Sequence, residues 1–146
     1  MKISKVLVAL DGSPEADMAF EYALALGKTF SAELILVNVL VIPPAPTMGV
    51  GFEGHKIREM IEKGASDIAV AMLDKKLKMA KAQSVETRSQ VLRGSPVEQI
   101  VLVASKEKAD LIVMRNRGLT GLKKILLGSV AWGVTQLATC PVLIVR

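Results

Sequence analysis

The residues best suited to chemistry in this 146-residue sequence lie between Met114 and Val130. This segment follows an apolar run and precedes a short helix pattern whose N-cap we expect to be Ser129. Glycine lets a backbone approach a ligand closely, and the first N–H groups of a helix attract anions. The segment is therefore a candidate phosphate-binding loop. Its basic residues and glycines are Arg115, Arg117, Gly118, Gly121, Lys123, Lys124 and Gly128.

Other patterns that could carry chemistry are weaker. Residues 49–54 read G-x-G-x-x-G, but prolines separate them from the preceding strand pattern, so we interpret them as loop and not as a dinucleotide fingerprint. The G-x-x-x-x-G-K-[ST] phosphate motif is absent from the sequence. His55 is the only histidine, and no cluster of residues has metal-ligand spacing. We expect no catalytic residues and no metal held by protein side chains.

Composition indicates a single domain over residues 1–146. The sequence is 51% hydrophobic but only 3% aromatic, so its core should be aliphatic. The net charge of +5 favours anionic ligands mildly. Cys140 is the only cysteine, which is typical of a reducing compartment, and we expect its thiol to be buried and inert. No signal peptide or membrane span is apparent, so a cytoplasmic location is expected.

Strand and helix patterns alternate along the chain and predict an α/β fold with a doubly wound parallel sheet. Helices are expected to begin at Ser13 and at Ser95, the second ending near Glu107, and to cover residues 56–82 and 129–137. Residues 42–55 contain prolines and glycines and are predicted to be a flexible loop. Strands are predicted at 5–10, 34–39, 85–91, 109–113 and 141–145, the third of them at an edge of the sheet.

The candidate loop resembles the nucleotide loop of the universal stress protein family, whose pattern is Gly-x2-Gly-x9-Gly-(Ser/Thr). Gly118, nine residues and Gly128-Ser129 match the second half of this pattern, whereas Arg115 stands where it begins with glycine. The segments 8–13 and 140–145 are also similar to the family, so the resemblance covers essentially the whole chain.

The resemblance implies a five-stranded sheet of order 3-2-1-4-5 with helices on both faces. It implies ATP as the ligand, with AMP or ADP as alternatives, and Mg²⁺ or Mn²⁺ carried by the phosphates. By the same resemblance, Asp11 accepts ribose hydroxyls, the backbone of Val39 meets the adenine edge, and Arg117 lies near the phosphates. The implied nucleotide-binding residues are Ala9, Leu10, Asp11, Val39, Met114, Arg115, Arg117, Gly118, Gly128, Ser129 and Val130.

The sequence thus predicts a nucleotide-binding stress-response or regulatory protein. ATP would act as a conformational switch with slow or no hydrolysis, so the protein is not expected to be an enzyme. The alternative is an interaction protein of the same fold that binds no nucleotide. A homodimer through strand 141–145 and a further, unidentified protein partner are expected. Membrane association is not expected, and RNA binding is ranked below both hypotheses because an aromatic stacking platform is missing.

Arg115 has two competing interpretations. If the loop needs a left-handed conformation there, arginine costs about 1–2 kcal/mol relative to glycine. Its guanidinium could instead form charge-assisted hydrogen bonds to phosphates. We expect nucleotide binding that is weakened but retained, and tighter ATP binding in an Arg115→Gly variant.

Overall fold

The computed structural model describes residues 2–42, 51–116 and 126–146. Strands and helices alternate along these residues, as the sequence predicts. They are β1 (Lys5–Ala9), α1 (Ala16–Phe30), β2 (Glu33–Leu40), α2 (Phe52–Ala82), β3 (Thr87–Arg93), α3 (Pro96–Glu107), β4 (Leu111–Arg115), α4 (Ser129–Leu137) and β5 (Val142–Val145). The strands pair in parallel as one five-stranded sheet of order β3-β2-β1-β4-β5. This confirms the predicted fold class.

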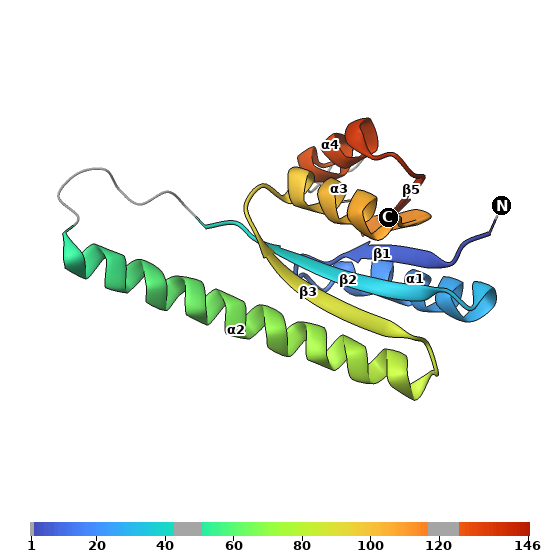
Figure 1. Ribbon diagram of the computed structural model, residues 1–146, viewed down its shortest axis with the longest axis horizontal. Coiled ribbons are helices and arrows are strands. Elements are labelled where there is room, and N and C mark those ends of the chain that lie inside the picture. The colour runs from blue at the N-terminus through green and yellow to red at the C-terminus, as the bar shows by residue number, and fades with distance from the viewer. Residues whose placement is uncertain (1, 43–50, 117–125) are drawn as a thin grey trace.

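Helices cover both faces of the sheet (Figure 1). On one face, Val6, Val8 and Leu36 pack with buried residues of α1 and α2. On the other, Leu7 and Ile112 pack with buried residues of α3 and α4. Successive residues of a strand point to opposite faces, so the continuous apolar run of β1 supplies both layers of the core.

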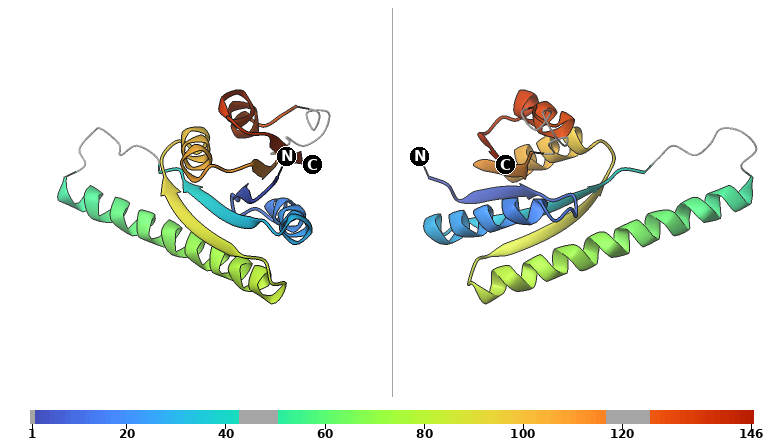
Figure 2. Two further views of the ribbon diagram at one scale, coloured as in Figure 1. Left: turned by 45° about the vertical axis from the view of Figure 1, so that its right-hand side comes forward. Right: turned by 180° about the vertical axis from the view of Figure 1, so that it is seen from behind.

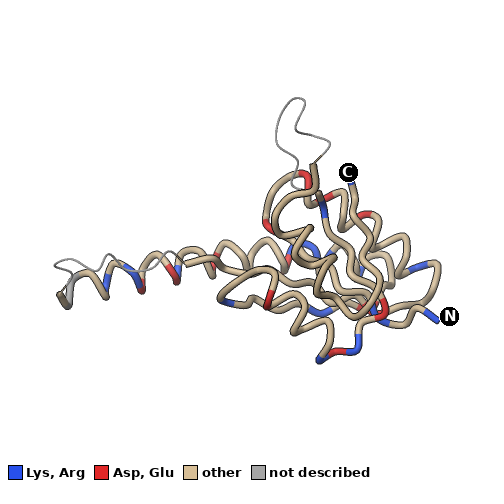
Figure 3. The backbone as a smooth tube through the Cα atoms, turned by 90° about the horizontal axis from the view of Figure 1, so that it is seen from above, with Lys and Arg blue, Asp and Glu red and all other residues tan. Residues whose placement is uncertain are grey.

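Helix α2 extends beyond the sheet (Figures 1 and 2). Its buried residues begin at Ala69, and no described side chain earlier in the helix is buried. Ile61 and Ile68 are 60% and 74% exposed. Acidic and basic residues are interspersed along this projecting part (Figure 3).

None of the helices in the described part of the chain combines the length and the apolar character needed to span a membrane.

The predicted loop over residues 42–55 is wrong in its last part. Helix α2 begins at Phe52, with Gly51 in an extended conformation as its N-cap, so residues 52–55 are helical. The N–H of Gly54 donates to the carbonyl of Gly51 at 3.0 Å. Both glycines therefore belong to the start of the helix, and the loop does not extend to residue 55. Residues 43–50, which include the start of the G-x-G-x-x-G pattern, lie outside the described residues.

Strands β3 and β4 each begin two residues later than predicted. Before β3, Ser84 adopts a left-handed conformation and Val85 donates to the carbonyl of Ala80, so these residues form the turn after α2. Before β4, Asp110 accepts hydrogen bonds from the backbone of Ser4 and Lys5 at 2.8 and 2.9 Å, instead of joining the strand. The shift in β4 makes Arg115 the last residue of that strand.

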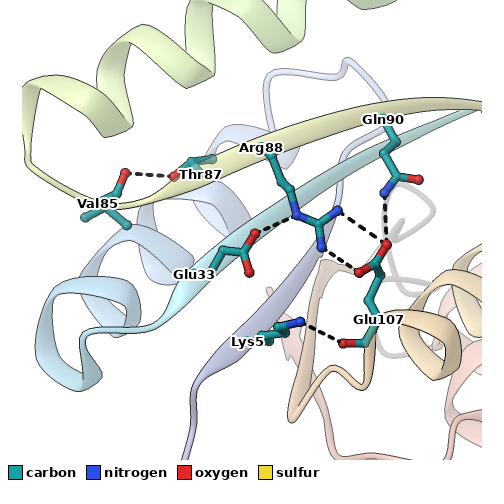
Figure 4. A network of polar contacts seen from close by, with 7 residues as sticks. All are labelled: Lys5, Glu33, Val85, Thr87, Arg88, Gln90 and Glu107. Carbon is teal, nitrogen blue, oxygen red and sulfur yellow. Dashed lines mark hydrogen bonds and ion pairs between the residues drawn. The ribbon is translucent and has the colours of Figure 1, made fainter.

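A network of ionic contacts joins four elements at the amino ends of the strands (Figure 4). Arg88 on β3 contacts Glu33 on β2 at 2.5 Å and Glu107 on α3 at 2.6 Å. Lys5 on β1 donates to the carbonyl of Glu107 at 3.3 Å. These contacts tie the end of α3 to the sheet and lie at the end opposite the carboxyl ends of the strands, where ligands of such sheets bind.

Candidate functional site

A cavity of about 490 Å³ opens at the carboxyl ends of β1, β2 and β4. Strands β1 and β4 are neighbours in the sheet although their connections leave in opposite directions, so the cavity lies at the topological switch point. Its wall is mostly apolar, and α2, α3 and α4 contribute to it. The lining residues are Ala9, Leu10, Asp11, Gly12, Val37, Asn38, Val39, Leu40, Val41, Ala65, Ile68, Ala69, Met72, Pro96, Ile100, Met114, Arg115, Val130 and Ala131.

Most of the residues proposed from the sequence meet at this cavity. The residues among them that line it are Ala9, Leu10, Asp11, Val39, Met114, Arg115 and Val130. Gly128 and Ser129 immediately precede Val130 at the start of α4. Arg117 and Gly118, together with Gly121, Lys123 and Lys124, lie outside the described residues.

Asp11 follows β1 and has several hydrogen-bond donors around its carboxylate. The Ser13 hydroxyl and backbone N–H donate to Oδ1 at 2.5 and 3.0 Å. The Ser13 hydroxyl in turn accepts from the N–H of Ala16 at 3.2 Å, so Ser13 supports the start of α1 although that helix begins at Ala16 and not at Ser13. Partial burial opposes ionisation of Asp11, but the hydrogen bonds from Ser13, followed by the charge and hydrogen bond of Arg115, lower its pKa. Asp11 is therefore an ionised hydrogen-bond acceptor at the mouth of the cavity.

Arg115 lies beside Asp11, because β4 and β1 are neighbouring strands, and contacts it directly. Arg115 Nε donates to Asp11 Oδ2 at 3.2 Å, and Arg115 Nη1 lies 3.8 Å from Glu15 Oε2. The side chain of Arg115 is only 15% exposed. Arg115 is in a strand, and the described non-glycine residues with positive φ are Ser31, Ser84 and Lys108. The left-handed strain considered from the sequence is therefore absent, because the strand continues through Arg115.

Asn116 fixes the two ends of the segment that sequence reasoning identified as a phosphate loop. Its N–H donates to the carbonyl of Val145 on β5 at 2.8 Å. Its side-chain Oδ1 accepts from the N–H of Gly128 at 2.9 Å, and its Nδ2 donates to the carbonyl of Leu126 at 3.4 Å. The sequence analysis did not identify Asn116 as a residue of the site. The only signal in the sequence was its position, an amide side chain between the end of a strand and a glycine-containing loop.

The start of α4 differs by one residue from the prediction. Gly128 is the N-cap, Ser129 is the first helical residue, and no side chain caps the helix. The N–H of Gly128 is held by Asn116, so the chain enters the helix without a serine cap. Among the described residues, the backbone N–H groups in the first turn of α4 beside the cavity consequently have no side-chain cap.

Asn38 is a second lining residue that sequence reasoning did not assign to the site. It is 7% exposed, and its Nδ2 donates to the carbonyl of Leu10 at 2.8 Å. This bond joins the ends of β1 and β2 directly before Asp11. The signal was present in the sequence, since Asn38 interrupts the longest apolar run, and a buried amide needs a polar partner.

The described residues do not form a metal cage. They contain no group of three or more metal-ligating side chains, and the carboxylates of Asp11 and Glu15 both face the Arg115 guanidinium. Cys140 is half-buried, and its pKa is raised by burial and by the charge of Asp110, which keeps its thiol protonated at neutral pH. Within the described part of the chain, the site offers an ionised acceptor, a guanidinium and the N–H groups of a helix start without a side-chain cap, around an apolar cavity.

The fold and the cavity define a doubly wound α/β domain with a ligand site at its switch point. Comparison with known proteins is consistent with this class: the family model described as "Universal stress protein family" matches residues 2–146. The chain is 39% identical to universal stress protein MJ0531 of Methanocaldococcus jannaschii over 97% of this chain and 81% of that protein. It is 33% identical to universal stress protein YxiE of Bacillus subtilis, covering 98% and 99% of the two chains. The protein belongs to the universal stress protein family.

A solved universal stress protein in complex with cAMP has the same fold. It is 28% identical to this chain, with a TM-score of 0.72 and coverage of 100% of this chain and 98% of that one.

Proposed function

We propose that this protein is a stress-response or regulatory protein that binds an adenine nucleotide in the cavity at the switch point. The observation that carries the proposal is the convergence there of an ionised carboxylate, Asp11, with the uncapped start of α4. A carboxylate accepts hydroxyl groups such as those of ribose, and helical N–H groups bind phosphate. The related protein solved with cAMP supports a nucleotide as the ligand class.

ATP is the proposed nucleotide, with AMP and ADP as alternatives, and any Mg²⁺ or Mn²⁺ would be carried by the phosphates. We propose that ATP acts as a conformational ligand with slow or no hydrolysis. A cytoplasmic location is proposed as well.

Isothermal titration calorimetry with ATP and AMP tests this function. Asp11→Ala should weaken binding at least about tenfold, because hydrogen bonds to a charged group contribute roughly 1.5–3 kcal/mol. Glu21→Ala is the matched control, since Glu21 is an exposed carboxylate on α1 outside the cavity lining. Equal affinity of the parent and Asp11→Ala would refute the role of Asp11, and no binding to the parent at millimolar nucleotide would refute the function.

A second candidate function is a dimeric interaction protein that binds no nucleotide. The contact between Arg115 and Asp11 favours it, because the guanidinium occupies an oxygen that a ribose would need. Absence of nucleotide binding together with a stable homodimer would select this alternative.

We also propose a homodimer through β5. This strand is at the edge of the sheet, next to β4. An apolar edge strand presents unpaired backbone groups to a second chain, and two-fold pairing is the commonest way to satisfy them.

A further inference from the structure

The side chain of Arg115 occupies part of the hydrogen-bonding capacity of Asp11. Asp11 Oδ1 already accepts two hydrogen bonds from Ser13, and Oδ2 accepts one from Arg115 Nε. Each carboxylate oxygen has two lone pairs. A ligand hydroxyl pair that uses Asp11 fully must therefore compete with the guanidinium for Oδ2.

Arg115 cannot lose this partner without a compensating anion. Its side chain is 15% exposed, so its charge is largely removed from water. The other described carboxylate near it is that of Glu15, which lies at 3.8 Å and is 65% exposed. Asp11 is 41% exposed, so the guanidinium is the less solvated partner, and removing Asp11 is costly because it leaves that charge uncompensated.

Two kinds of ligand affect this ion pair differently. A nucleoside offers two neutral ribose hydroxyls; the first can use the free lone pair of Oδ2, but the second can bind only by displacing Arg115, which then keeps only the exposed Glu15. A nucleotide offers the same hydroxyls together with a phosphate. Arginine binds phosphate through two parallel N–H···O bonds, which replace the bonds lost from the carboxylate.

We infer that Arg115 determines ligand class at this site, by exchanging Asp11 for a phosphate so that nucleotides bind and free nucleosides are rejected. This inference rests on the proposed nucleotide-binding function. It reverses the expectation that Arg115 weakens binding and supports the competing interpretation, in which the guanidinium binds phosphate, because the structure shows its partner Asp11.

Calorimetric titration with AMP and with adenosine tests the inference through the ratio of their dissociation constants. In the parent protein, AMP should bind at least tenfold more tightly than adenosine. In Arg115→Gln, AMP should bind more weakly and adenosine more tightly, so that the ratio falls at least tenfold. Arg115→Lys keeps the charge and should retain most of the ratio.

Arg93→Gln is the matched control, because it makes the same change of net charge at an exposed residue at the end of β3, outside the lining of this cavity. Its ratio should equal that of the parent. Circular dichroism confirms that each variant is folded, and Arg115→Met, which also removes the charge and should lower the ratio, carries the comparison if Arg115→Gln is not folded.

The outcomes separate the two proposals. If the parent binds AMP but Arg115→Gln keeps the parent's ratio, the selective role of Arg115 is refuted while nucleotide binding stands. A parent that binds adenosine as tightly as AMP also refutes it. If neither ligand binds the parent at millimolar concentration, the proposed function fails and this inference fails with it.

Discussion

Replacing Gly133 with alanine should destabilise the protein, although alanine is the better helix former. Gly133 lies in α4, and a methyl group there would be 2.7 Å from Cγ2 and 3.0 Å from Cγ1 of Val97 on α3. Val97 is β-branched and stiff about χ1, so it cannot easily rotate away. The glycine therefore allows the close approach of α3 and α4 that places the start of α4 beside the cavity.

The expected magnitude follows from two opposing effects. Overpacking of a filled interior costs roughly 1–3 kcal/mol, whereas alanine gains about 1 kcal/mol over glycine inside a helix. The net loss should be roughly 0–2 kcal/mol, which for a domain of this size lowers Tm by up to roughly 8 °C. Thermal unfolding followed by circular dichroism measures it.

Two further variants distinguish the clash with Val97 from the general effect of replacing glycine with alanine in a helix. Val97→Ala removes both methyl groups that the new side chain would meet, so the double variant should be more stable than the sum of the single losses predicts. Gly64→Ala makes the same change in α2, where nothing lies within 4 Å of the added methyl. It should raise helicity and leave Tm unchanged or higher. Stability changes of Gly133→Ala and Val97→Ala that simply add in the double variant would refute the packing argument.

Three other predictions follow from the described contacts. Ile144→Pro should yield a monomer in light scattering, while Ile144→Ala should stay dimeric. The carbonyls of Pro141 and Val145 accept hydrogen bonds from the β4 side, and alternate residues of a strand point their backbone groups to opposite sides, so the Ile144 N–H faces the free edge. A monomeric parent would refute the β5 dimer. The backbone N–H groups of Ser4 and Lys5 lower the pKa of Asp110 below 3.8, so its contribution to stability is complete above that pH and is lost as the pH falls through the folded-state pKa. In urea titrations, the stability difference between the parent and Asp110→Asn should therefore shrink below about pH 4, and a constant difference would contradict this assignment. Lys76 is 5% exposed and donates to Asp17 at 2.6 Å. Asp17→Ala leaves this buried charge unpaired and should lower the free energy of unfolding by about 1–2 kcal/mol, whereas Lys76→Met should lower it much less. The reverse order in urea unfolding would refute the argument.

Much of the fold could be predicted from the sequence because its local signals agree with one another. The apolar run of β1 indicates a strand that is buried on both faces, and such a strand requires helices on either side. Alternation of strands and helices then leaves few topologies with right-handed connections. The strand order itself came from the family resemblance carried by Gly118, Gly128 and Ser129.

The limits of sequence reasoning appear where a residue acts through a partner far along the chain. Asp110 leaves the apolar pattern of β4 because its carboxylate binds the backbone of residues 4 and 5, so the strand begins later than the pattern predicts. Gly27 and Gly133 look alike as helix-weakening residues, and only the positions of Val85 and Val97 show that neither site has room for a methyl group.

The candidate site divides in the same way. The sequence by itself determined that Asp11 and the start of α4 belong to one end of the sheet, because parallel strands bring their carboxyl ends to the same edge. It could not determine what Arg115 does, since its partner Asp11 is 104 positions away in the sequence. Only the tertiary structure decided this, because the pairing of β1 with β4 puts the ends of both strands side by side and so brings a carboxylate and a guanidinium within hydrogen-bonding distance.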